Sequence, residues 1–238
     1  MTKPLYTEHY PSFSPSDRVA LAALIQRVAK PGCRMAEIGS WLGQGSTQIF
    51  LEMLRPHADS SVLFIDTWLG SPSAAKHQDI VSRFDVFGTF RANVEKAKSP
   101  VTSNALVATS LEAAKIVADN AFDLVFIDAD HSYENVRKDI AAWRSKVRPG
   151  GILCGHDCET RVTPALRQTL LDNRDKDTIA GTGTPFVHIH PGSALAVDEA
   201  FQGQANLFAE MPIKMPDGSV TLSTIWFVMV PEEPQPAG

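Results

Sequence analysis

The stretch Arg34-Met-Ala-Glu-Ile-Gly-Ser-Trp-Leu-Gly-Gln-Gly-Ser-Thr47 is the part of the chain on which the predicted architecture depends. Met35 to Ile38 are mostly apolar and predict a short buried strand. The glycines at 39, 43 and 45 predict a loop with little side-chain bulk, and the next segment, Gln48 to Arg55, has helical spacing. A strand, a glycine loop and a helix in this order are typical of nucleotide-like ligand sites in open α/β sheets, because the helix N-terminus offers unpaired N–H groups.

The spacing of the glycines restricts the class of ligand that the loop is expected to bind. The order Gly39-x-x-x-Gly43-x-Gly45 differs from the G-x-G-x-x-G pattern that holds a dinucleotide pyrophosphate, so a dehydrogenase is disfavoured. With Glu37 before it, the loop is similar to the first motif of class I S-adenosylmethionine-dependent methyltransferases, which folds around the methionine end of the cofactor. Without further motifs, an ordinary tight turn between strand and helix explains the glycines equally well.

The composition is that of one globular domain. The chain has 238 residues, of which 44% are hydrophobic and 21% charged, with a formal net charge of -5. This charge gives no reason to expect nucleic acid or an anionic membrane as a partner. No apolar run reaches the length of a membrane span, and the N-terminal residues lack a signal-peptide pattern. We therefore expect a cytoplasmic protein.

Five apolar segments alternate with helical ones. The alternation predicts an α/β fold with a Rossmann-like, doubly wound parallel sheet. Two later segments, joined by a turn at 216–218, are expected to add strands. The expected strands are 35–38, 62–66, 104–109, 122–128, 152–157, 206–209 and 221–230, and the expected helices are 14–28, 48–55, 79–98, 111–119, one starting near Ser132, and 193–201.

We expect a single domain over residues 1–238 with four distinctive parts. Residues 1–33 form an N-terminal arm and a helix, and residues 69–100 form either a lid over the ligand or a plain packing helix. Residues 158–192 form an extra segment on the substrate side. The proline-rich residues 231–238 are expected to be a disordered tail.

Acidic and polar residues follow the predicted strands. Asp66 ends the second strand, where a carboxylate accepts hydrogen bonds from ribose hydroxyls, although a helix N-cap is the alternative. Trp68 either packs on an adenine or fills the core. Ser110 follows the third strand, where it would meet the adenine edge. These positions indicate an adenosine ligand without identifying which one.

The spacing of cysteines and histidines allows two further metal sites as hypotheses. Cys154, His156 and Cys158 alternate, so one extended face would hold all three, but a zinc site would need a further ligand and free cysteines are commonly core residues. His188 and His190 alternate in the same way. A metal role for that pair competes with a structural one.

Four blocks together resemble class I methyltransferases, in the group that includes small bacterial sugar and natural-product O-methyltransferases. The blocks are Glu37-Ile-Gly-Ser-Trp-x-Gly, Phe64-Ile-Asp-Thr-Trp68, Phe126-Ile-Asp-Ala-Asp-His-Ser-Tyr-Glu134 and Arg148-Pro-Gly-Gly-Ile-Leu-Cys-Gly-His-Asp157. The resemblance implies a seven-stranded sheet with an antiparallel last strand, and methyl transfer to a hydroxyl of a small molecule such as a sugar or secondary metabolite. The cofactor residues that it implies are Glu37, Gly39, Ser40, Trp41, Gly43, Ser46, Asp66, Thr67, Trp68, Ser110 and Asp128.

The same resemblance implies a metal site and a base. Asp128, His156 and Asp157 match the positions that bind Mg²⁺ in metal-dependent members such as catechol O-methyltransferase, although histidine is softer than the usual ligand there. Asp130 competes with Asp128 as a ligand or caps a helix. His131 matches the position of the catalytic base, with a second-shell histidine as the alternative. His156 becomes the candidate base if no metal binds.

Two other functions remain open. A relative with the same fold can carry out different chemistry, such as a hydroxylase-like reaction. Alternatively, the protein binds S-adenosylmethionine without catalysis. The acceptor and the oligomeric state, including a homo-oligomer, are not determined by the sequence.

Overall fold

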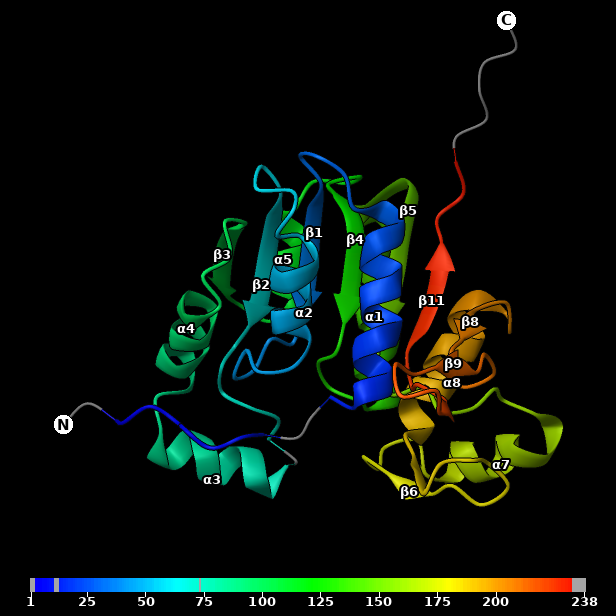
Figure 1. Cartoon of the computed structure of the whole chain (residues 1–238). Helices are drawn as coiled ribbons and strands as arrows, with labels where there is room; N and C mark the ends of the chain where they lie inside the picture. The colour runs from blue at the N-terminus through cyan, green and yellow to red at the C-terminus, as the bar shows by residue number, and fades with distance from the viewer. Residues whose placement is uncertain (1–2, 11–12, 73, 233–238) are drawn as a thin grey trace, which may run out of the picture.

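One seven-stranded sheet with helices on both faces forms the centre of the molecule (Figure 1). The computed structural model describes residues 3–10, 13–72 and 74–232. The strand order is β3-β2-β1-β4-β5-β11-β8; β11 runs antiparallel to both of its neighbours and the other pairs are parallel. This confirms the predicted doubly wound sheet with an antiparallel last strand. The strands are β1 Arg34–Ile38, β2 Ser61–Asp66, β3 Thr102–Val107, β4 Phe122–Ile127, β5 Val147–Gly155, β8 Asn206–Leu207 and β11 Trp226–Met229.

Two apolar cores cover the two faces of the sheet. Helices α1, α2, α3 and α4 contribute to one core and helices α5, α6, α7 and α8 to the other. Every residue of β4 is buried, and its side chains alternate between the two cores, as expected for a central parallel strand. The helices are α1 Pro15–Val28, α2 Ser46–Met53, α3 Ala75–Arg83, α4 Val86–Lys96, α5 Ser110–Ile116, α6 Tyr133–Trp143, α7 Pro164–Asp172 and α8 Pro191–Phe201, with a 3-10 turn at Arg144–Lys146.

The start of α1 is tied to the far end of the chain through Asp17. Ser14 and Asp17 form a capping box at the start of this helix. Asp17 Oδ1 also accepts hydrogen bonds from Ser223 Oγ at 2.7 Å and Thr224 N at 3.0 Å, and Asp17 Oδ2 lies 3.3 Å from His156 Nε2. Burial alone would raise the pKa of Asp17, but His156, Ser14 and Ser223 together lower it to about 2. One buried carboxylate therefore joins α1, β5 and β11.

We expect Asp17→Asn to lower the free energy of unfolding by about 2 kcal/mol at pH 7, since one pKa unit corresponds to about 1.4 kcal/mol. Because the folded pKa of Asp17 is depressed from 3.8 to about 2, its contribution is present above pH 4 and is lost as the pH falls toward 2. Urea unfolding at pH 7, 5, 4 and 3 measures the difference between wild type and variant. A difference that stays constant down to pH 3 would contradict this account.

Two expected elements are wrong in their extent. The single helix predicted over 79–98 is two helices, because Asp85 stops α3 and caps α4 by accepting a hydrogen bond from Gly88 N at 2.9 Å. The strand predicted over 221–230 is broken at Ser223 and Thr224, where Asp17 takes up the hydrogen bonds. The turn at 216–218 therefore joins a small separate hairpin, β9 Ile213–Lys214 and β10 Val220–Thr221, and does not join β8 to β11.

The terminal and extra segments lie around the sheet. Residues 3–10 have no helix or strand. Residues 158–192 contain α7 and the hairpin of β6 Ile179–Ala180 and β7 His188–Ile189. Most of the expected disordered tail, residues 233–238, lies outside the described residues. Within the part of the chain that is described, no helix has the length and apolar character needed to cross a membrane.

Candidate functional site

Two adjoining cavities lie at the carboxyl ends of the central strands. The larger, of about 700 Å³, is lined by residues that follow β1, β4 and β5, and the smaller, of about 430 Å³, extends past the end of β2. Gly39, Trp41, His77 and Asp128 line both. The cavities therefore form one elongated site at the edge of the sheet where open α/β folds bind their ligands.

The glycine loop is the floor between the two cavities. Gly39 has φ +91°, and a Cβ atom there would overlap the carbonyl oxygen of Asp128. Its N–H donates to Ile65 O at 2.8 Å, so the loop passes closely between the ends of β2 and β4. Trp41 also has a positive φ, of 43°, a conformation that a non-glycine residue adopts only when its surroundings require it.

Asp66 holds this loop in place. Its Oδ2 accepts a hydrogen bond from Trp41 N at 2.7 Å and its Oδ1 one from Trp68 N at 2.6 Å. Burial raises the pKa of Asp66, against the lowering effect of these backbone hydrogen bonds. Asp66 lines the smaller cavity with Thr67 and Ser110. The carboxylate thus shapes the loop at a position where it also lines the smaller cavity.

Three buried polar atoms around the loop have no hydrogen-bond partner among the described residues: Glu37 Oε1, Ser40 Oγ and Trp41 Nε1. Burial raises the pKa of Glu37 to about 7, although Ser46 and Thr47 donate hydrogen bonds that lower it. Buried polar groups are normally paired, and orphaned ones mark a missing partner. Ser40 and Trp41 line the larger cavity, so a polar ligand bound there would supply partners for these two side chains.

A second wall of the larger cavity carries Asp128, His156 and Asp157. One ligand atom from each lies within 4.8 Å of the others. His156 Nδ1 is 3.0 Å from Asp157 Oδ1 and 3.6 Å from Asp128 Oδ1. Asp157 has φ +60°, which turns its carboxylate toward the histidines at a cost in backbone strain. Strain of this kind is usual at functional sites.

His131 lies between two carboxylates. Its Nε2 is 2.9 Å from Asp157 Oδ2, and its Nδ1 is 3.0 Å from Asp177 Oδ1. Burial lowers the pKa of His131, but the charge of Asp157 and hydrogen bonds to Asp128, Asp157 and Asp177 raise it well above 6.5. The neighbouring carboxylates therefore favour the charged form of the His131 ring.

Aromatic side chains from three segments cover the outer side of the cavity. His77, on α3, stacks on Trp41 with ring centres 4.4 Å apart, and its Nε2 is 2.9 Å from the hydroxyl of Tyr10 in the arm. Helix α3 is thus in contact with the site, and the role of residues 69–100 as a moving lid stays a prediction.

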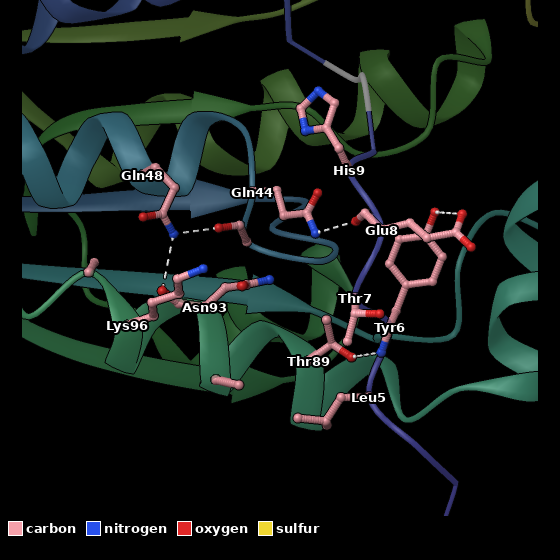
Figure 2. A pocket seen from close by; sticks show the side chains of 13 residues that line it. Leu5, Tyr6, Thr7, Glu8, His9, Gln44, Gln48, Thr89, Asn93 and Lys96 are labelled. Atoms are coloured by element: carbon pink, nitrogen blue, oxygen red, sulfur yellow. Dashed lines mark hydrogen bonds between the residues drawn. The ribbon is translucent and has the colours of Figure 1, made fainter.

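The arm itself borders a separate groove. Figure 2 shows it crossing the glycine loop and α4, where Gln44 Nε2 donates to Glu8 O at 2.9 Å and Tyr6 N donates to Thr89 Oγ1 at 2.9 Å. The groove, of about 620 Å³, shares Gly43 and Gln44 with the larger cavity. The arm therefore supports the loop from behind.

Most residues expected from the sequence line the two cavities. Two do not: Glu37 lies behind the loop, where its Oε2 accepts from Thr47 Oγ1 at 2.6 Å, and Trp68 is in the core against Phe87 and Phe90. The expected residues that do line them are Gly39, Ser40, Trp41, Gly43, Ser46, Asp66, Thr67, Ser110, Asp128, His131, His156 and Asp157.

The structure also places Asp130, the cysteines and the pair His188 and His190. Asp130 accepts a hydrogen bond from Ser132 N at 2.9 Å and lines the cavities beside Asp128. Cys154 and Cys158 are buried, and no cluster of metal-ligand type among the described residues includes a cysteine, so the cysteine zinc site is wrong. Of the histidine pair, His188 is exposed and His190 lines the larger cavity.

Sequence reasoning missed Tyr10, His77, Asp177 and His190 as wall residues. All four come from the arm, the insertion or the extra segment, and none lies directly after a strand of the main sheet. The alternation of His188 and His190 was a signal, but it did not indicate which histidine faces the site.

A family model described as a methyltransferase domain matches residues 36–158, more than half of the chain. No curated protein matches the sequence. Similar solved structures include an O-methyltransferase from Bacillus cereus in complex with SAH (19% identity, TM-score 0.54, 92% of this chain and 82% of that one).

Two other solved structures are similar to this chain. One is TomG from Streptomyces achromogenes, an O-methyltransferase of tomaymycin synthesis in complex with SAM (16% identity, TM-score 0.55, 92% and 82% coverage). The other is a putative rRNA methylase from Clostridium thermocellum (9% identity, TM-score 0.54, 92% and 98% coverage). At these identities the likeness establishes the fold alone.

Proposed function

Because the chain belongs to the methyltransferase-domain family and is a class I S-adenosylmethionine-dependent methyltransferase, we propose that it methylates a hydroxyl of a small molecule with the help of Mg²⁺. The observation that carries this proposal is the continuity of the site. Asp66 lines the smaller cavity, Asp157 lines the larger one, and Asp128 lies in the wall that the two cavities share. Adenosine would lie beside Asp66, and the acceptor beside Asp128 and Asp157.

The Asp128, His156 and Asp157 set fits a divalent cation. Two carboxylates and one imidazole lie within 4.8 Å of one another, and Asp17 lies behind His156 Nε2. Metal-bound histidines commonly donate their second N–H to such a carboxylate. Bound Mg²⁺ would polarise neighbouring acceptor oxygens and lower the pKa of the hydroxyl. We assign the ion to these three residues on this chemistry.

His131 is our candidate for the group that receives the proton of the acceptor hydroxyl. Its Nε2 lies 2.9 Å from Asp157 and 3.9 Å from Asp128, beside the proposed acceptor. The neighbouring carboxylates raise the pKa of its ring, and additional positive charge in the cavity would lower that pKa. Without a metal, His156 would be the alternative.

The charge of the cavity supports a small acceptor without phosphate. Its lining has one lysine, Lys76, and no arginine, against five aspartates. Even with His131, His156 and His190 protonated beside Lys76, the five aspartates leave no net positive charge to attract phosphate groups. The rRNA substrate of one structural neighbour is therefore disfavoured here. A neutral or cationic hydroxylated molecule such as a sugar or secondary metabolite suits it better. The aspartates are Asp128, Asp130, Asp157, Asp175 and Asp177.

Calorimetry with S-adenosylmethionine, before and after EDTA and with added Mg²⁺, tests the proposal. We expect the cofactor to bind in every condition. In an assay with labelled cofactor and a panel of diols, we expect methyl transfer to be lost with EDTA and restored by Mg²⁺. Transfer that is unaffected by EDTA would remove the metal from the proposal. Cofactor binding without transfer to any hydroxylated acceptor would favour the non-catalytic alternative.

A further inference from the structure

Three side chains at the mouth of the larger cavity form a second cluster of metal-ligand type. His131, Asp177 and His190 each place one ligand atom within 4.8 Å of the other two. We propose that they bind a second divalent cation, of the borderline-soft class represented by Zn²⁺, at a site distinct from that of Asp128, His156 and Asp157. Two of its three residues lie beyond residue 158, where the match to the methyltransferase family ends.

Both histidines are held by buried carboxylates on the side away from the proposed ion. Glu159, whose side chain is 3% exposed, accepts hydrogen bonds from His190 N at 2.9 Å and is 2.7 Å from His190 Nδ1. Asp157 faces His131 Nε2. Carboxylates in this position fix the tautomer of a metal-binding imidazole, because they take its one N–H and leave the lone pair on the other nitrogen.

The remaining nitrogens are available to a cation. No hydrogen bond or ion pair between described residues uses His190 Nε2, although the ring lines the cavity. His131 Nδ1 has Asp177 as its partner at 3.0 Å. The side chain of Asp177 is 70% exposed, which gives an ion a path from solvent. Two imidazoles and one carboxylate suit Zn²⁺ and related ions, whereas Mg²⁺ prefers oxygen ligands.

The three segments that carry these ligands are packed against one another. Gly192 lies two residues after His190. A Cβ atom at this position would lie closer than van der Waals contact to His131 O, Tyr133 N and Arg174 O. Tyr133 N also donates a hydrogen bond to Arg174 O at 3.3 Å. The loop after β4, the segment after α7 and the start of α8 therefore hold the ligands in a built arrangement.

Occupation of this site would affect His131 in a defined way. An ion on Nδ1 keeps the proton of the ring on Nε2, so the side chain no longer accepts a proton from the acceptor. Zn²⁺ is therefore expected to lower methyl transfer; this consequence rests on the proposed function, whereas ion binding does not.

The test is calorimetric titration of the EDTA-treated full chain with Zn²⁺, and with Co²⁺ for its absorption spectrum. We expect the wild type to bind two equivalents of Zn²⁺. Asp177→Ala and His190→Ala are each expected to weaken the affinity for the same one of these two ions by tenfold or more. Glu159→Gln is expected to weaken the same equivalent about 10-fold, the lower end of the usual second-shell effect. Asp128→Asn should weaken the other equivalent. His188→Ala is the matched control, because His188 is exposed and two residues from His190.

The outcomes separate clearly. Absence of Zn²⁺ binding, or wild-type binding by both Asp177→Ala and His190→Ala, would overturn the proposal. An equal loss in His188→Ala would show nonspecific binding and would also overturn it. Thermal melting of each variant checks the fold, and Asp177→Ala is expected to melt like the wild type because its side chain is exposed. Failure of methyl transfer in every condition would count against the proposed function and not against this site.

Discussion

Gly39→Ala is expected to abolish measurable binding of S-adenosylmethionine and to lower the free energy of unfolding by about 3 kcal/mol. Positive φ costs an L-residue about 1–2 kcal/mol, and steric overlap in a packed site about 1–3 kcal/mol more. The overlap is with the backbone carbonyl of Asp128, which no side-chain rotation relieves. The loop would have to move away from the end of β4, which would displace both cavity walls. Calorimetry with the cofactor and urea unfolding measure the two effects.

Gly183→Ala separates the effect of φ from that of steric overlap. Gly183 has φ +80°, no atom lies within 4 Å of the place that a Cβ atom would take, and the residue lies in the hairpin of β6 and β7. We expect a loss of about 1–2 kcal/mol in unfolding free energy and normal cofactor binding. Normal binding by Gly39→Ala as well would contradict the placement of the cofactor on this loop.

Asp128→Asn is expected to weaken S-adenosylmethionine binding about 10- to 100-fold, because a charge-assisted hydrogen bond contributes about 1.5–3 kcal/mol. Asp128 lines both cavities and faces His156 and His131, so its carboxylate serves the cofactor and the proposed ion together. In the diol assay, the variant is expected to lose the response to Mg²⁺.

Asp130→Asn is the control for the loss of one negative charge. Asp130 lines the same cavities, but its Oδ1 is used by the backbone N–H of Ser132. Asparagine keeps an acceptor there, so we expect less than about a threefold change in cofactor affinity. Equal effects of the two substitutions would mean that Asp128 acts only through the general charge of the cavity.

The sheet and the positions of most site residues could be predicted from the amino-acid sequence. Local apolar spacing and the glycines predict strand β1, the glycine loop and α2. These signals involve only residues a few positions apart in the sequence. Asp66, Asp128 and Asp157 follow directly after strands, and the carboxyl ends of parallel strands share one edge of a sheet. Their convergence is therefore a consequence of topology, which the alternation of strands and helices predicts.

Contacts between distant segments account for the rest. Trp68 is in the core because α4 brings Phe87 and Phe90 to it, and the last strand is short because Asp17, 206 residues earlier, binds Ser223. Likewise, His190 and not His188 faces the cavity because Glu159 holds it. Such choices depend on the free energy of burying and pairing polar groups that meet only in the folded chain, so no local pattern specifies them.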